Sequence, residues 1–219
     1  EYTALVASNS INFFDAIRLV RKRGELMQSA IPTGTGSMAA ILGLEDALII
    51  EICQKASNQG VVEAVNFNSP GQVVIAGEKN AVAHACELMK EAGAKRALVL
   101  RVSVPSHCSL MKDAAGKFKT YIEFVDLNAG NVEVIHNVNA DYAGDNEAIK
   151  GKLVEQLFMP VLWTDSVKKM KDSGVERLIE VGPGKVLTGL TRRIDKSLSA
   201  SAIIDVSSLK STIEEISNA

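Results

Sequence analysis

A single histidine has the clearest potential for chemistry in this chain. His107 stands in the run Ser103-Val104-Pro105-Ser106-His107-Cys108-Ser109-Leu110-Met111, after a predicted strand has ended and before a predicted helix begins. Imidazole titrates near neutral pH and can both accept and return a proton, and loops on a rigid scaffold often carry catalytic groups. We therefore interpret His107 as a candidate general base. The alternative is a histidine with a structural role.

Arg23 is the second candidate because of its place on a predicted helix. At about 100° per residue, it projects from within an apolar arc, whereas the other charged residues lie on the opposite side. The arc comprises Ala16, Leu19, Val20, Leu26 and Met27. A buried guanidinium is unfavourable unless an anion pairs with it. We expect the partner to be either an internal Asp or Glu, or a substrate carboxylate held by the planar guanidinium.

The cysteines give weaker signals. Cys53, Cys86 and Cys108 are far apart and form no CxxC pair, which favours free thiols in a reducing compartment. Neither His107-Cys108 nor His84-x-Cys86 has further ligands at a suitable spacing, so no metal site is expected. Adjacent side chains in an extended chain point to opposite sides, which disfavours Cys108 as a nucleophile activated by His107.

A glycine-rich turn, Gly182-Pro183-Gly184-Lys185, joins a predicted strand to a predicted helix. Main-chain amides at such a helix start favour anions. The turn is not a P-loop, because Val186 stands where Ser or Thr is required. Five basic residues supply local positive charge. They could bind an anionic partner, or they could simply form a solvated surface. These basic residues are Lys95, Arg96, Lys185, Arg192 and Arg193.

Composition limits the class of protein. The 219 residues are 47% hydrophobic and 23% charged, with a formal net charge of −2. Such values are typical of a globular protein and give no overall reason to expect nucleic acid or a membrane as partner. No apolar run approaches the roughly 18–20 residues that span a bilayer, and no signal-like start is present. We expect a cytoplasmic protein. The first residue is not Met, which is consistent with an incomplete or processed polypeptide.

The first half of the chain predicts two helices and then a small sandwich. Residues 1–31 predict the helices, with Asn12 as N-cap of the second and Pro32 beyond its end. Residues 38–102 predict the order β-α-β-β-α-β, which is typical of a ferredoxin-like split βαβ unit. Strands are expected at 38–42, 61–68, 72–76 and 96–102, and helices at 45–56 and 80–91.

The pattern changes beyond Pro105. Isolated strands separated by longer helices favour parallel α/β architecture. The strands are too few for a complete parallel sheet, so part of the sheet is expected to lie outside this chain. Helices are expected at 110–124, 146–158, 166–173 and from 186, and strands at 132–138 and 177–181.

Taken together, these segments resemble the malonyl-CoA:acyl-carrier-protein transacylase family of bacterial type II fatty acid synthesis. The resemblance extends over essentially the whole chain, in the family's order. It implies an incomplete α/β-hydrolase-like parallel-sheet domain, formed by residues 1–32 and 104–219, with residues 33–103 inserted as a ferredoxin-like small subdomain. The matching stretches are residues 1–6, Arg23-Gly24 with Met27-Gln28, 65–77, 102–111, Gln156-Leu157 and 181–193.

The resemblance also implies an activity and a site. The family transfers a malonyl group from malonyl-CoA to the phosphopantetheine thiol of acyl carrier protein through a serine acyl-enzyme. That serine, in a Gly-His-Ser-x-Gly turn, falls immediately before Glu1, so the chain as given is expected to be inactive. His107 matches the general base and Gln156 the residue whose main-chain carbonyl orients it. Arg23 matches the clamp on the malonyl carboxylate, and Asn68 a polar residue of the cleft.

The remaining expectations concern partners and alternatives. We predict that the five basic residues form the surface that binds the acidic carrier protein or CoA. No cofactor is implied, and the complete protein is expected to be a monomer. One alternative is an acyltransferase domain of a polyketide synthase, against which the run Val104-Pro105-Ser106-His107 argues. The other is a non-catalytic binding module built on the ferredoxin-like unit, which leaves Arg23 and His107 without a role.

Overall fold

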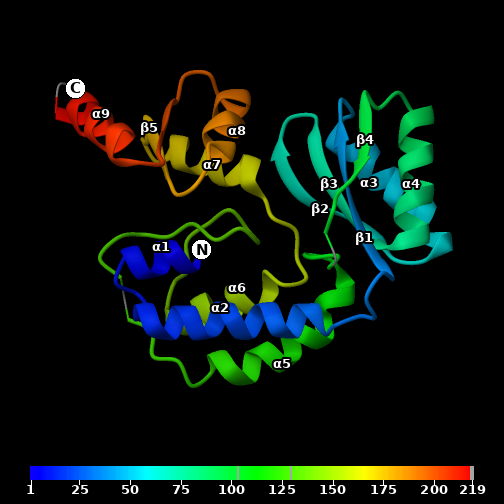
Figure 1. The fold of residues 1–219 in the computed structure, drawn as a ribbon, viewed down its shortest axis with the longest axis horizontal. Helices are drawn as coiled ribbons and strands as arrows, with labels where there is room; N and C mark the ends of the chain where they lie inside the picture. Colours follow the sequence, from blue (N-terminus) through cyan, green and yellow to red (C-terminus); the bar gives the residue numbers. More distant parts are fainter. Residues whose placement is uncertain (103, 129, 218–219) are drawn as a thin grey trace. The chain divides into compact units, whose positions relative to one another are not determined.

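The computed structural model describes residues 1–102, 104–128 and 130–217. The chain is mixed α/β, as predicted, and divides into two compact units, Glu1–Ser166 and Val167–Ala219 (Figure 1). Across the described ranges, no helix combines the length and the apolar character that crossing a membrane requires.

Unit 1 contains an antiparallel sheet with the strand order β2-β3-β1-β4. The elements follow the predicted β-α-β-β-α-β order, although the last strand ends three residues early. They are β1 (Gly36–Leu42), α3 (Asp46–Ala56), a 3-10 turn (Ser57–Gln59), β2 (Val62–Ser69), β3 (Gln72–Glu78), α4 (Lys79–Glu91) and β4 (Arg96–Val99).

Both faces of this sheet are buried, by different partners. Successive side chains of a strand point to opposite faces. Ile41 and Ile75 pack against α3 and α4, which cover one face (Figure 1). Val65 and Val74 pack on the opposite face, against Cys108. The loop that carries His107 therefore lies on the sheet, on the face that the two helices leave uncovered.

The rest of unit 1 is a helical layer in which α2 lies alongside α5 (Figure 1). The helices are α1 (Tyr2–Ala7), α2 (Phe13–Gln28), α5 (Lys112–Ile122), preceded by a 3-10 turn (Ser109–Met111), and α6 (Asn146–Glu155). The Asn12 N-cap is confirmed, because its Oδ1 accepts a hydrogen bond from Phe14 N at 2.9 Å. Leu5, Leu19, Phe118 and Leu153 are among the buried residues that join these helices.

Two expectations about apolar residues are wrong. Val20, placed in the apolar arc of α2, is 48% exposed, because it borders an open hollow beside Tyr2 and Val6 of α1. The strand predicted at 132–138 does not form: Val132 is 64% exposed, and the segment makes only an isolated bridge between His136 and Asp141. An alternating pattern yields a strand only where a neighbouring strand accepts its hydrogen bonds.

Unit 2 pairs two parallel strands with short helices. β5 (Arg177–Val181), α8 (Val186–Ile194) and α7 (Trp163–Asp172), which crosses the boundary from unit 1, lie where helices and a strand were predicted. The prediction missed β6 (Ser199–Ile203) and α9 (Val206–Ser217). β6 reads Ser-Ala-Ser-Ala-Ile, and these residues carry little of the β-branched and aromatic character that identifies a strand.

Candidate active site

The backbone of His107 is held in an uncommon conformation. Its φ of +66° lies in the left-handed region, which costs a non-glycine residue about 1–3 kcal/mol and persists only where surrounding contacts enforce it. His107 N donates to Leu157 O at 3.0 Å. The adjacent Cys108 is fully buried against the sheet, and its thiol donates to Pro105 O at 3.1 Å. These contacts fix the direction in which the imidazole projects.

The imidazole is oriented by a main-chain carbonyl. His107 Nδ1 lies 2.7 Å from the carbonyl oxygen of Gln156. Since a carbonyl can only accept, Nδ1 carries the hydrogen and Nε2 is left as the basic nitrogen. Gln156 is the C-cap residue of α6, where the last carbonyls have no partner within the helix. The end of α6 therefore supplies the free acceptor that this tautomer needs.

Burial keeps His107 in its neutral form. Desolvation lowers the pKa of His107 below its ordinary 6.5, and the positive charge of Arg23 adds to that effect. The hydrogen bond to the Gln156 carbonyl and the charge of Glu1 oppose the shift without cancelling it. At neutral pH the side chain is therefore ready to accept a proton.

Arg23 is a half-buried cation beside the same glutamine. Its Nη2 donates to Gln156 Oε1 at 2.7 Å. No carboxylate of the described residues comes within 4.0 Å of the guanidinium, and its buried Nε has no hydrogen-bond partner among them. Burial lowers the pKa of Arg23, while the nearby Tyr2 and Glu1 raise it. Arginine stays charged in proteins. Of the two partners expected for Arg23, an internal acid is thus contradicted.

A polar chain supports Gln156 from behind. Gln156 Nε2 donates to Asn137 Oδ1 at 3.4 Å, and Asn137 N donates to Glu1 Oε1 at 2.7 Å. Glu1 Oε1 also lies 3.3 Å from His136 Nδ1, and both of these side chains are at most 3% exposed. Burial alone would raise the pKa of Glu1, but the contacts with His136 and Asn137 lower it. No sequence pattern indicated this support, because its members are distant along the chain.

The other site residues predicted from the sequence do not join this cluster. Asn68 lies half-buried in β2, and none of its contacts in the described structure is a hydrogen bond to Arg23, His107 or Gln156. Cys108 is an unsuitable nucleophile, because burial raises the pKa of its thiol to about 12.

The five predicted docking cations are exposed and divided between the two units. Lys95 and Arg96 lie at the start of β4 in unit 1. Lys185, Arg192 and Arg193 lie in and before α8 of unit 2. Lys185 and Arg192 line a hollow of about 800 Å³ in unit 2 that also contains Arg177.

The start of α8 already binds an anion that belongs to the protein. Glu180 Oε2 accepts hydrogen bonds from Thr188 N and Thr188 Oγ1, both at 2.8 Å. Burial opposes ionisation of Glu180, but these bonds lower its pKa. The anion preference predicted for the turn at 182–185 is therefore met, at least in part, by an internal carboxylate.

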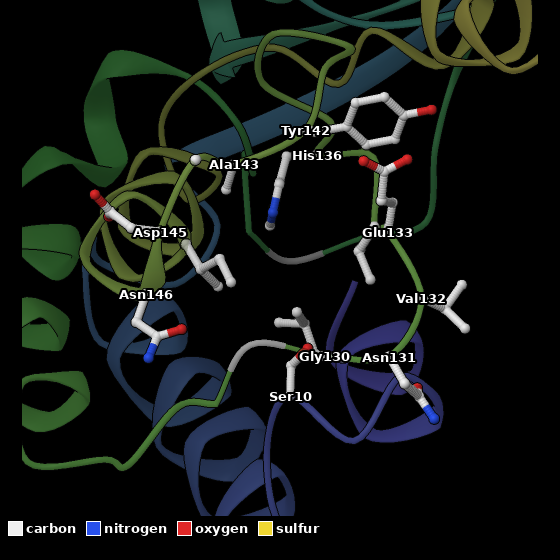
Figure 2. A pocket seen from close by; sticks show the side chains of 14 residues that line it. Ser10, Gly130, Asn131, Val132, Glu133, His136, Tyr142, Ala143, Asp145 and Asn146 are labelled. Atoms are coloured by element: carbon white, nitrogen blue, oxygen red, sulfur yellow. The ribbon is translucent and has the colours of Figure 1, made fainter. Parts of the chain in front are cut away.

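A separate hollow of about 270 Å³ in unit 1 lies beside the Glu1–His136 pair. Figure 2 shows Ser10 and Gly130 facing His136 and Ala143 across it. Its lining includes Glu133 and Asp145 and excludes His107 and Arg23. Two acidic side chains do not suit an anionic substrate, so this hollow is distinct from the cluster around Gln156.

Comparison with known proteins defines the class of protein. The family model described as "Acyl transferase domain" matches residues 1–213, and the chain belongs to this family. Its sequence is 54% identical to the malonyl CoA-acyl carrier protein transacylase of Escherichia coli (strain K12), over 98% of this chain and 69% of the relative. It is 44% identical to that of Bacillus subtilis (strain 168), over 99% and 68%. The predicted family resemblance is confirmed.

Solved structures agree with the sequence relatives. An acyl carrier protein S-malonyltransferase from Vibrio cholerae superposes with a TM-score of 0.95 at 55% identity, covering 97% of this chain and 69% of that one. A malonyl-transacylase in complex with a holo type II polyketide synthase acyl-carrier protein superposes with a TM-score of 0.96 at 50% identity, covering 98% and 69%.

Proposed function

We propose that this protein transfers a malonyl group from malonyl-CoA to the phosphopantetheine thiol of an acyl carrier protein, for fatty acid synthesis. The proposal rests on the cluster at Gln156. The main-chain oxygen of Gln156 orients the imidazole of His107, and its side chain accepts a hydrogen bond from the guanidinium of Arg23, which no carboxylate of the described residues neutralises. A base and a fixed cation side by side suit an acyl group that ends in a carboxylate. The names of the relatives support this assignment.

His107 serves as general base in both half-reactions. The family resemblance assigns the nucleophile to a serine in a Gly-His-Ser-x-Gly turn directly before the position of Glu1. Nε2 of His107 takes the serine proton as the oxygen attacks the thioester carbonyl, and it returns that proton to the CoA sulfur as the C–S bond breaks. It then takes the proton of the phosphopantetheine thiol, whose sulfur attacks the acyl-serine. The departing serine oxygen recovers the proton.

Arg23 selects the acyl group. Its guanidinium binds the free carboxylate of the malonyl group, which an acetyl group lacks. Gln156 Oε1 accepts a hydrogen bond from Nη2 and so holds one edge of the guanidinium in place. Asn68 is assigned to the polar wall of the cleft through the family resemblance alone.

We infer that residues 33–103 form a ferredoxin-like subdomain inserted into a larger α/β-hydrolase-like domain made of residues 1–32 and 104–219. The strand order β2-β3-β1-β4 supports the first part, and the family match over residues 1–213 supports the second. We also infer a cytoplasmic location, because the free Cys53, Cys86 and Cys108 suit a reducing compartment.

The function is tested on the protein as its gene encodes it. After incubation with malonyl-CoA and a holo acyl carrier protein, the intact mass of the carrier should increase by one malonyl group. A carrier of unchanged mass in the presence of a folded protein would favour the non-catalytic binding module instead.

The docking cations lead to a prediction about ionic strength. Reversing charge with Arg192→Glu and Arg193→Glu should lower kcat/KM for the carrier protein about tenfold at low salt, because electrostatic steering of an acidic partner is lost. The difference should shrink as salt is added. Lys55→Glu is the matched control, since Lys55 is exposed and pairs with Glu51 on α3. Equal losses in both proteins, or a salt-insensitive difference, would contradict the docking site.

The lowered pKa of His107 leads to a prediction about pH. The base must be neutral to work, and its pKa lies below 6.5 in the folded protein. As pH falls, kcat/KM for malonyl transfer should therefore decline with a midpoint below 6.5, and activity should be retained above it. A pH profile of initial rates measures the midpoint. A midpoint above 6.5 would mean that a charged partner stabilises the imidazolium and that burial does not dominate.

A further inference from the structure

We propose that Glu63 is a positioning residue for the general base: its carboxylate, on a strand of the small sheet, fixes the loop that carries His107. The proposal rests on the role of His107 in the proposed function. It adds a residue that lies 44 positions away in sequence and touches neither substrate nor imidazole.

Glu63 binds the loop with both carboxylate oxygens. Oε2 accepts a hydrogen bond from Ser109 N at 3.1 Å, and Oε1 accepts one from the Ser109 hydroxyl. Ser109 begins the 3-10 turn that leads into α5, and main-chain N–H groups at such a start have no partner within the helix. The Glu63 carboxylate, which comes from a distant strand, therefore caps this helix start two residues after His107. These two hydrogen bonds from Ser109 to Glu63 form a clamp on the loop.

The strand register points Glu63 toward the loop. Val62 belongs to the core between the sheet and its two helices, and Val65 to the cluster on the opposite face with Cys108. Glu63 follows Val62 and shares the face of Val65, because side chains alternate along a strand. Burial of Cys108 and the clamp on Ser109 thus attach two consecutive residues after His107 to the same face of the sheet.

β2 also holds the segment that follows Gln156, the residue whose carbonyl contacts His107. Val161 N donates to Val65 O at 2.8 Å, and Phe67 N donates to Val161 O at 2.9 Å. Thr164 Oγ1 donates to Phe67 O at 3.0 Å. These bonds attach the segment after Gln156 to β2, and the two bonds of Val161 join main-chain groups that no side-chain substitution removes. Glu63 adds a side-chain contact from the same strand, and this contact holds the His107 loop.

Loss of the clamp should affect the base and spare the cation. His107 keeps its left-handed backbone only while both sides of the loop are held, by Leu157 O before it and by Ser109 after it. Arg23 reaches Gln156 from α2, and its hydrogen bond goes to that glutamine and not to a described residue of the loop. Removing Glu63 should therefore lengthen the Nδ1–carbonyl contact of His107 while the guanidinium stays in place. Catalysis should weaken and binding of malonyl-CoA should not.

The test compares Glu63→Ala with two related variants in the protein as its gene encodes it. For Glu63→Ala we expect kcat for malonyl transfer to fall about tenfold, because small displacements of a catalytic group have large effects, with KM for malonyl-CoA unchanged within about twofold. The NMR signal of the His107 Nδ1 proton should move toward that of an unbonded imidazole. Glu63→Gln retains an acceptor for Ser109 N and should recover part of kcat, and Ser109→Ala, which removes only the hydroxyl, should lose less.

Glu78→Ala is the matched control. Glu78 is the last residue of the adjacent strand β3, and its carboxylate accepts a hydrogen bond from Val61 N, just before β2, at 3.4 Å and not from the loop. It should alter neither kcat nor the Nδ1 signal. Glu63 is not a positioning residue if its variants leave the Nδ1 signal and kcat unchanged, if KM rises instead of kcat falling, or if Glu78→Ala has equal effects. Should Glu63→Ala fail to fold, Glu63→Gln and Ser109→Ala decide. The NMR measurement needs no turnover, so a protein without transferase activity would refute the proposed function while the signal still tests the clamp.

Discussion

Replacing His107 with alanine should lower kcat for malonyl transfer by about 10³-fold, within the range of 10²–10⁴ that a positioned base contributes. The expected loss is large because, in the proposed mechanism, the neutral imidazole serves both half-reactions. Its tautomer is already set by the Gln156 carbonyl at 2.7 Å. Single-turnover acylation of the protein by malonyl-CoA measures the first half-reaction, and transfer to the carrier protein measures the second. Both should slow.

The control for this prediction is His84→Ala. His84 is half-buried in the middle of α4 and belongs to the helix that covers the small sheet. Its loss should leave both half-reactions within about twofold of the unmodified protein, because His84 lies on α4 and outside the cluster around Gln156. If His107→Ala retained more than about a tenth of the normal rate, the loss would be smaller than the roughly 10²-fold that is the least a positioned base contributes. Another group would then be the base.

Replacing Arg23 with alanine should remove the preference for malonyl groups. Truncating one partner of a buried charge pair costs about 2–5 kcal/mol, so kcat/KM for malonyl-CoA should fall at least about 30-fold. Transfer of an acetyl group, which has no carboxylate, should change little. Arg21→Ala is the matched control, because Arg21 is 82% exposed and pairs with Glu25 at 3.0 Å. Equal losses for malonyl and acetyl groups would mean that Arg23 supports the fold instead of selecting the substrate.

The same variant carries a second expectation, for stability. No carboxylate of the described residues neutralises Arg23, and its Nε is buried without a partner. Removing such a group should leave the free energy of unfolding unchanged or raise it, since burying an unpaired charge is unfavourable. Urea denaturation of the unmodified protein and of Arg23→Ala measures the difference in their free energies of unfolding. A marked loss of stability would indicate that the hydrogen bond from Arg23 to Gln156 supports the fold instead.

The parts of the site that follow local rules were predictable from the sequence. The helical arc placed Arg23 on an inward-facing side of α2, and the Asn12 cap fixed where that helix begins. Alternation and the turn at 69–71 predicted the strands of the small sheet. Gln156 and its carbonyl came from the family resemblance, and the position of that residue at the end of α6 gives a physical reason for it.

The parts that depend on tertiary contacts were not predictable. Glu63 and Ser109, or Asn137 and Gln156, meet only because the chain folds back on itself, and no spacing rule joins residues so far apart. The strand expected at 132–138 fails because an alternating pattern does not specify whether a partner strand lies beside it. Val20 shows the same limit, since helical periodicity locates an apolar side but not what covers it.

In the proposed mechanism, Arg23 binds the carboxylate of the acyl group while His107 moves the proton. The most direct test is a cycle of four kcat/KM values: the unmodified protein and Arg23→Ala, each with malonyl-CoA and with the analogue whose terminal carboxylate is a carboxamide. We predict a coupling free energy of about 2–3 kcal/mol between the guanidinium and the carboxylate. A coupling near zero, with both substrates weakened alike, would contradict the account.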